Sequence, residues 1–196
     1  MKHLPKLAAL LIIVMISAFT FSPKVTDYLS VPGPIVLNNV SYNLTWSSHP
    51  SAPYYKQEYI RSGDNLEKFN KMVMVELLIG TSKPIDLAQA KIGELKEMKK
   101  TNPVINYESF QKNGEVLLDF LISQNTPDGK IKILERNVYR YKAFTDKSGQ
   151  KGVMLFGASE RSYDKEADTY LTNLKNTKSV LLNAVAAYAL PAISLK

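Results

Sequence analysis

The stretch KMVMVELLIG, residues 71–80, decides the fold, because it predicts a β-strand that is apolar along nearly its whole length. A strand with apolar side chains on both of its faces belongs inside the molecule, where both faces are covered. We therefore expect residues 71–80 to form a central strand, and the rest of the chain to supply its neighbours in the sheet and the layers that cover it.

The strands expected before this one differ in how clearly the sequence marks them. Residues 40–47 give the clearest alternation in the chain, with Val40, Tyr42, Leu44 and Trp46 on one face. This pattern predicts that Trp46 points into the core. Residues 35–37 precede it as the first arm of a short hairpin, and residues 54–61 follow it as a strand of mixed polarity.

Two amphipathic helices are expected, one before and one after a set of strands in the order of the chain. The first begins near Pro84, with Ser82 as its cap and Asp86 in its first turn, and its apolar stripe is Ala88, Ile92, Leu95 and Met98. The second runs from about Asp164 to Leu190 and ends before Pro191. Because residues 180–190 are apolar nearly all round, we expect that part to be deeply buried.

Between the helices the sequence predicts an antiparallel meander. Residues 104–112 and 115–123 flank Asn113-Gly114, a pair that suits a tight hairpin turn. Residues 130–144 form the longest predicted strand, and residues 152–160 complete the sheet. The fold class is therefore α+β, with one antiparallel β-sheet packed against two helices.

The order of these elements resembles the PsbP-like fold of extrinsic photosystem proteins and their non-photosynthetic relatives. Glu58-Tyr59-Ile60, followed by residues 63–73, GDNLEKFNKMV, is similar to a strand-turn-strand segment of small exported bacterial proteins of unknown role. The resemblance covers residues 35–190 in element order. It implies a PsbP-like α/β sandwich that serves as an accessory or binding module, and it carries over no catalytic residue.

The start of the chain indicates export. Lys2 and Lys6 precede the apolar run 7–21, which is shorter than the about 20 residues that span a bilayer. We predict a cleaved signal peptide at 1–22, a flexible lead-in at 23–34 and a single α+β domain at 35–190. The expected location is the periplasm or the outside of a bacterium, and an uncleaved signal that tethers the domain to a membrane is the alternative.

Composition excludes several chemistries. The chain has no cysteine, so disulfides, thiolate metal sites and thiol nucleophiles are impossible. His49 is the one histidine beyond the predicted signal, which excludes a multi-histidine zinc site. We predict no catalytic residue, metal or cofactor, and a non-enzymatic binding or accessory module. A hydrolase of the cell envelope that works through carboxylates or His49 is the alternative.

One predicted strand carries the candidate binding residues. Lys132, Arg136, Arg140 and Lys142 share one parity in the strand 130–144, so they are expected on one face of the sheet. With a net charge of +7, the chain favours anionic partners such as an anionic lipid, an acidic glycan or an acidic protein. A solvated outer face is the simpler interpretation, and pairing of the arginines with Glu135 or Asp119 inside the fold is another. No pattern specific to nucleic-acid binding is present.

Overall fold

The computed structural model describes residues 25–195, which form eight strands and two helices. The predicted signal peptide, residues 1–22, lies outside the described residues. In chain order the elements are β1 (Ile35–Leu37), β2 (Val40–Ser51), β3 (Tyr54–Ile60), β4 (Lys71–Ile79), α1 (Pro84–Lys99), β5 (Asn106–Lys112), β6 (Glu115–Asn125), β7 (Ile131–Thr145), β8 (Lys151–Tyr163) and α2 (Lys165–Ala187).

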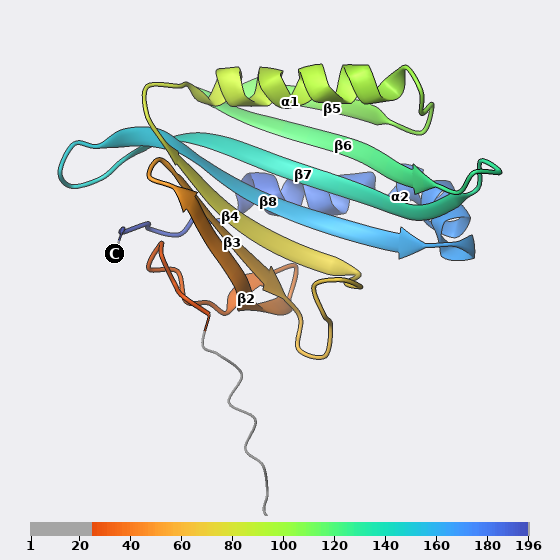
Figure 1. The fold of residues 1–196 in the computed structure, drawn as a ribbon, viewed down its shortest axis with the longest axis horizontal. Helices are drawn as coiled ribbons and strands as arrows, with labels where there is room; N and C mark the ends of the chain where they lie inside the picture. Colours follow the sequence, from red (N-terminus) through yellow and green to blue (C-terminus); the bar gives the residue numbers. More distant parts are fainter. Residues whose placement is uncertain (1–24, 196) are drawn as a thin grey trace, which may run out of the picture.

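All eight strands belong to one curled antiparallel sheet with the order β1-β2-β3-β4-β8-β7-β6-β5 (Figure 1). The predicted central strand is central, because β4 pairs with β3 on one side and with β8 on the other. The last strand, β8, thus lies between β4 and β7. It connects the strands that precede α1 in the chain, β1 to β4, to those that follow it, β5 to β7. The predicted α+β class and the packing of one antiparallel sheet against two helices are confirmed.

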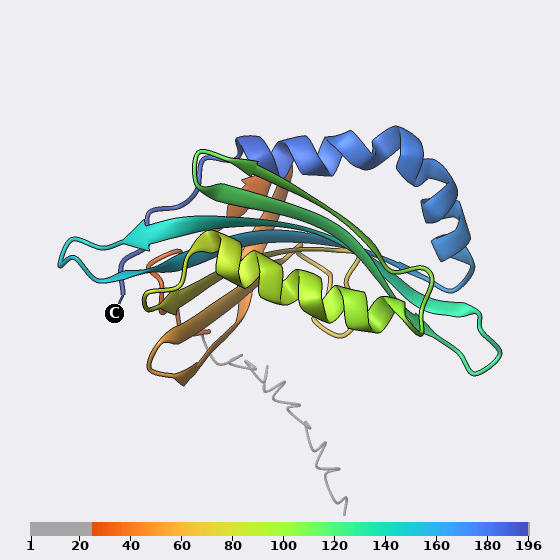
Figure 2. The ribbon, with the colours of Figure 1, turned by 90° about the horizontal axis from the view of Figure 1, so that it is seen from above.

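The two helices lie on opposite faces of the sheet, as Figure 2 shows from above. Helix α2 packs on β7 and β8, where Leu181 and Val185 join one core cluster. Helix α1 packs on β5, β6 and β7, where Ala88 and Leu95 join a second cluster. We refer below to the α2 face and the α1 face of the sheet.

The helix ends and their burial differ from the prediction in two places. The N-cap of α1 is Lys83 rather than Ser82, and the Asp86 side chain accepts a hydrogen bond from the Lys83 amide at 2.7 Å. Helix α2 ends at Ala187 rather than at Leu190, and residues 180–190 are not buried all round, since Val180 is 58% exposed. Only one side of the helix meets the sheet, so Leu181 and Val185 are buried, Leu182 and Ala184 are partly buried, and Val180 faces outwards.

The prediction that Trp46 points into the core is wrong. The pairing of β2 with β3 shifts register between Leu44 and Trp46, so that Leu44 pairs with Tyr59 and Trp46 with Glu58. A β-bulge of this kind reverses the alternation of side chains beyond it. Tyr42 therefore lies in the core under α2, while Trp46 is turned to the α1 face and is 39% exposed.

The predicted flexible lead-in, residues 23–34, is packed against the sheet in the part that the structure describes. Leu29 is fully buried, and its amide donates to Gln57 Oε1 at 2.9 Å. Tyr59 donates its hydroxyl to the carbonyl of Val31 at 2.6 Å. The segment after α2 joins the same layer, since the Ser194 amide donates to Leu29 O at 3.0 Å. The apolar side chains at 29 and 31 explain the packing. The turn-forming residues around them are the reason that the sequence predicted a flexible segment.

Candidate functional site

Strand β7 places the four predicted binding residues in different surroundings. Their shared parity directs them to the α2 face, but this face is covered by the helix, because both arginines donate to main-chain oxygens of α2 or of its C-terminal end. Lys132 is exposed near the start of β7 and lies roughly 26 Å from Arg140 at about 3.3 Å per residue. The structure therefore does not bring the four cations together as one open patch, and their binding of an anion stays a prediction.

Arg136 is a buried structural residue. It is 1% exposed, and its Nε and Nη2 donate to the two carboxylate oxygens of Asp119 at 3.0 and 2.9 Å. Nη2 also donates to the carbonyl of Lys178 in α2 at 2.6 Å. Burial alone would lower the pKa of Arg136, but the hydrogen bonds and charge of Asp119 raise it above its ordinary value. The ion pair thus ties β6 and β7 to the middle of α2.

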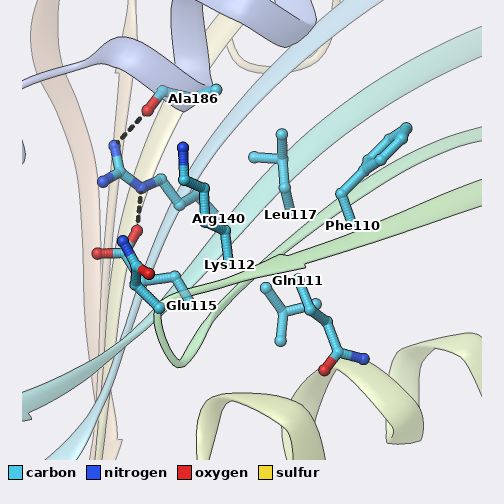
Figure 3. Close-up of a pocket in the computed structure, with 9 residues that line it drawn as sticks. Phe110, Gln111, Lys112, Glu115, Leu117, Arg140 and Ala186 are labelled. Atoms are coloured by element: carbon cyan, nitrogen blue, oxygen red, sulfur yellow. Dashed lines mark hydrogen bonds and ion pairs between the residues drawn. The ribbon is translucent and has the colours of Figure 1, made fainter.

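Arg140 serves the C-terminal end of α2. Helix ends carry carbonyl groups without partners and a partial negative charge, and the last turn of α2 has no basic residue of its own. Arg140 supplies that charge from the sheet, because its Nη1 donates to Ala186 O (Figure 3) and to Tyr188 O, both at 2.9 Å. Its Nε donates to Glu115 Oε2 at 2.6 Å. Among the described residues, Nη2 of Arg140 has no hydrogen-bond acceptor.

Beside Arg140 lies a pocket of about 310 Å³ between the β5–β6 hairpin and the end of α2. Phe110 and Leu117 form its apolar part, and Lys112 and Arg140 lie next to them in Figure 3, whereas Gln111 points to the other side of the strand. Phe110 is an apolar side chain that is 44% exposed, in a strand whose other exposed residues are polar. The Asn113-Gly114 turn, with φ values of 52° and 78°, closes the hairpin as predicted and sets Lys112 beside Glu115.

The electrostatics of the pocket are those of a partly neutralised cationic site. Glu115 contacts Arg140 and also Lys142, whose Nζ lies 3.2 Å from Glu115 Oε1. Burial tends to raise the pKa of Glu115, but the hydrogen bonds from Arg140 and Lys142 outweigh it and the pKa is lowered. Glu115 is therefore ionised at neutral pH. Among the residues that line the pocket it offsets one of the two cations, Lys112 and Arg140, which leaves a positive balance in the lining.

Sequence reasoning identified Arg140 and Lys142 but missed Phe110, Lys112 and Leu117. One signal was present, because Phe110 is the one wholly apolar residue in the strand NYESFQK. The position of Ala186 could not have been inferred, since it depends on where α2 ends relative to β7.

His49 and the carboxylates do not form a recognisable catalytic arrangement. The His49 ring stacks on Tyr55 with centroids 3.9 Å apart, and its Nδ1 lies 3.0 Å from the Tyr54 carbonyl oxygen. Within residues 25–195, no group of three or more His, Asp or Glu side chains could hold a metal ion. In the same part of the chain, no helix has the length and apolarity needed to cross a membrane.

Comparisons with known proteins give a family and one structural similarity. A protein-family model matches residues 29–190, so the chain belongs to the family that this model describes. A search of curated proteins found no match. The chain is similar to the crystal structure of LpqN, described as "involved in cell envelope biogenesis of Mycobacterium tuberculosis", with 18% identity, coverage of 77% of this chain and 79% of that chain, and a TM-score of 0.38.

Proposed function

We propose that this chain is an exported, non-enzymatic binding module whose pocket beside the end of α2 takes an amphipathic anion, such as the acyl chain and acidic headgroup of a lipid. The observation that carries the proposal is the position of Phe110 and Leu117 directly beside Lys112 and Arg140 in one pocket. Small-ligand sites are typically apolar concavities with a few well-placed polar groups, and volumes of about 300 Å³ or more are usual.

The polar groups of the pocket favour an anion over a cation. Arg140 keeps Nη2 available, and among the described residues Lys112 makes no ion pair. Arg140 is also held rigidly by Glu115 and two carbonyl oxygens, so little side-chain entropy is lost when a carboxylate or phosphate binds. Of the anionic partners expected from the sequence, a lipid fits best, because Phe110 and Leu117 offer a surface for hydrocarbon that a glycan or an acidic loop would leave unused.

The test compares two amphiphiles that share one hydrocarbon chain. Laurate and dodecyltrimethylammonium, both below their micelle-forming concentrations, are titrated into the purified protein by calorimetry. Laurate should bind more tightly. Replacing Phe110 by Ala should weaken laurate binding by about tenfold through lost apolar contact, and Lys112→Gln should weaken it by about threefold, more at low salt than at high salt.

Two matched variants serve as controls. Val36→Ala removes an apolar side chain that is 55% exposed on β1, at the opposite edge of the sheet. Lys147→Gln removes an exposed cation from the β7–β8 turn. Neither should change laurate binding. Equal affinity for the two amphiphiles, or loss of binding in the controls as large as in Phe110→Ala, would refute the proposal.

The proposal includes the location and the architectural class. The charged start and the short apolar run 7–21 support export to the periplasm or beyond with removal of residues 1–22. An antiparallel sheet between two helices supports a PsbP-like sandwich. Mass spectrometry of the protein from envelope and cytoplasmic fractions tests the first point, and a cytoplasmic chain that retains Met1 would contradict it.

A further inference from the structure

The α1 face is only half covered by its helix. Helix α1 packs on β5, β6 and β7, and Figure 1 shows β2, β3 and β4 fanning away from it. The uncovered half carries Tyr54 and Lys56 of β3 and Glu76 of β4, and these side chains lie at the boundary between the helix and the open strands.

A groove of about 420 Å³ follows that boundary. Its walls are the flank of α1, the strands β3, β4 and β8, and tyrosines from β7. Its apolar lining is Leu78, Leu87, Ala90, Val153 and Leu155. Its charged lining consists of two cations, Lys56 and Lys91, and two carboxylates, Glu76 and Glu94. These four charges balance, so the groove has no net preference for an anion or a cation.

Tyr141 supplies a polar group that the fold leaves unused. It is 3% exposed and lines the groove, and no hydrogen-bond partner for its hydroxyl is found among the described residues. Tyr139, the next tyrosine on this face of β7, is half-buried and also lines the groove, and its hydroxyl has no partner among the described residues either. Glu76 and Glu94 line the same groove as Tyr141. Among the described residues, the one buried side-chain polar atom without a partner is Asn137 Nδ2, so the Tyr141 hydroxyl reaches the open space of the groove, where a ligand hydroxyl can bond it.

The remaining polar groups of the groove are already positioned. Tyr54 donates its hydroxyl to Glu76 Oε2 at 2.8 Å, and Lys56 Nζ lies 3.6 Å from Glu76 Oε1 and 2.8 Å from Glu58 Oε1. The groove therefore offers fixed carboxylate acceptors and fixed ammonium and phenol donors at close spacing. A ligand that both donates and accepts hydrogen bonds on neighbouring atoms matches this arrangement, as the vicinal hydroxyls of a sugar do.

Trp46 adds an aromatic surface at the edge of this groove. The bulge in β2 turns the indole to the α1 face, where the ring centroid lies 6.0 Å from Lys56 Nζ. An exposed indole presents a π-face with partial negative charge, against which the polarised C–H groups of a pyranose ring pack well. The register shift thus exposes the Trp46 ring to solvent beside Lys56, where a sugar ring in the groove could stack on it.

We propose that this groove binds a neutral carbohydrate chain, with Trp46 stacking on one sugar ring and Tyr141, Glu76 and Lys56 hydrogen-bonding the hydroxyls of the next. The site lies on the opposite face of the sheet from the pocket beside α2 and is independent of the function proposed for that pocket. Charge balance separates the two sites, because the pocket beside α2 favours an anion and the groove favours a neutral polyol.

The test uses the single tryptophan of the chain as its reporter. Cellotetraose, maltotetraose, chitotetraose and xylotetraose are each titrated into the purified protein to millimolar concentration while Trp46 emission is recorded. At least one should shift or quench the emission with saturation. Tyr141→Phe, which keeps the ring and removes the hydroxyl, should weaken that binding by about fivefold to tenfold. Trp46→Ala, followed by calorimetry, should weaken it at least as much.

Two control variants locate the binding in this groove. Tyr107→Phe removes the hydroxyl of a half-buried tyrosine that lies outside the groove, and it should leave sugar binding unchanged. Phe110→Ala should weaken laurate binding without affecting the sugar. The inference is overturned if no tetrasaccharide binds, or if binding is unaffected by both Tyr141→Phe and Trp46→Ala. Either result would leave the proposal for the pocket beside α2 intact.

Discussion

On the α2 face, polar side chains beneath the helix hydrogen-bond to it and to each other, whereas on the α1 face two tyrosines of β7 beside the helix have no hydroxyl partner among the described residues. Arg136 and Arg140 each donate to main-chain oxygens of α2 or its end, and Tyr59 is buried with its hydroxyl bonded to Val31 O. On the other face, Tyr141 lies against the groove with no partner for its hydroxyl among the described residues. Tyrosine is therefore structural at position 59 on one face and available for binding at position 141 on the other.

The largest expected effect tests the structural role on the α2 face. Asp119→Ala would leave the Arg136 guanidinium buried without its carboxylate, which typically costs about 3–5 kcal/mol of unfolding free energy. Urea denaturation at neutral pH measures the loss.

A double variant sharpens that result. Asp119→Leu combined with Arg136→Met replaces the pair by apolar side chains, so it should recover much of the stability lost in the single variant. If the single variant were no less stable than the double variant, the ion pair would not be the reason that these residues occupy the core.

The second prediction compares two tyrosines across the sheet. Tyr59→Phe removes a fully buried hydroxyl that donates to Val31 O and accepts from Gln57 Nε2 at 2.6 Å, so it should cost about 2 kcal/mol. Tyr141→Phe removes a hydroxyl without a partner among the described residues, so its effect should stay within about 0.5 kcal/mol. The comparison is made from thermal and urea unfolding of both variants. Equal costs would show that the Tyr141 hydroxyl has a structural role.

The contrast between the faces also explains what the sequence could and could not predict. Period-two alternation placed Arg136 and Arg140 on one face correctly, and the continuous apolar stretch of β4 correctly indicated a central strand. Alternation, however, shows only which residues of a strand share one face of the sheet. Whether a helix covers that face depends on contacts across the whole sheet, and the buried Arg136 guanidinium is paired because Asp119, a diagonal neighbour on β6, reaches it.

Local interruptions of the pattern were harder still to foresee. The bulge between Leu44 and Trp46 leaves no mark in the alternation of residue types, yet it moves Trp46 to the other face. Similarly, the apolar side chains at 29 and 31 are few, and only the partners Gln57 and Tyr59 in β3 reveal why that segment packs. The candidate groove depends on both the bulge and the half coverage by α1, so no local pattern could have pointed to it.

The third prediction concerns the end of α2. Arg140→Met keeps much of the side-chain volume but removes the hydrogen bonds to Ala186 O and Tyr188 O, so we expect a loss of about 1.5 kcal/mol and fraying of the last turn. Hydrogen exchange of the amides in residues 183–188 should increase more than that of α1. Uniform exchange in both helices would show that Arg140 does not hold this end specifically.

The smallest expected effect is a pH dependence confined to Glu115. Burial tends to raise its pKa, but the hydrogen bonds from Arg140 and Lys142 lower it below the value in the unfolded chain. A carboxyl group with a lowered folded-state pKa contributes stability above its unfolded pKa and loses that contribution as the pH falls through the folded pKa. Since the group is partly exposed, the contribution should be only about 0.5 kcal/mol.

Glu115→Gln should therefore reduce the melting temperature slightly at pH 7, and the difference from the unmodified chain should shrink as the pH falls through the acidic range. A difference that stays constant with pH would mean that Glu115 stabilises the hairpin by packing alone, and the partial neutralisation of the pocket would then need another source.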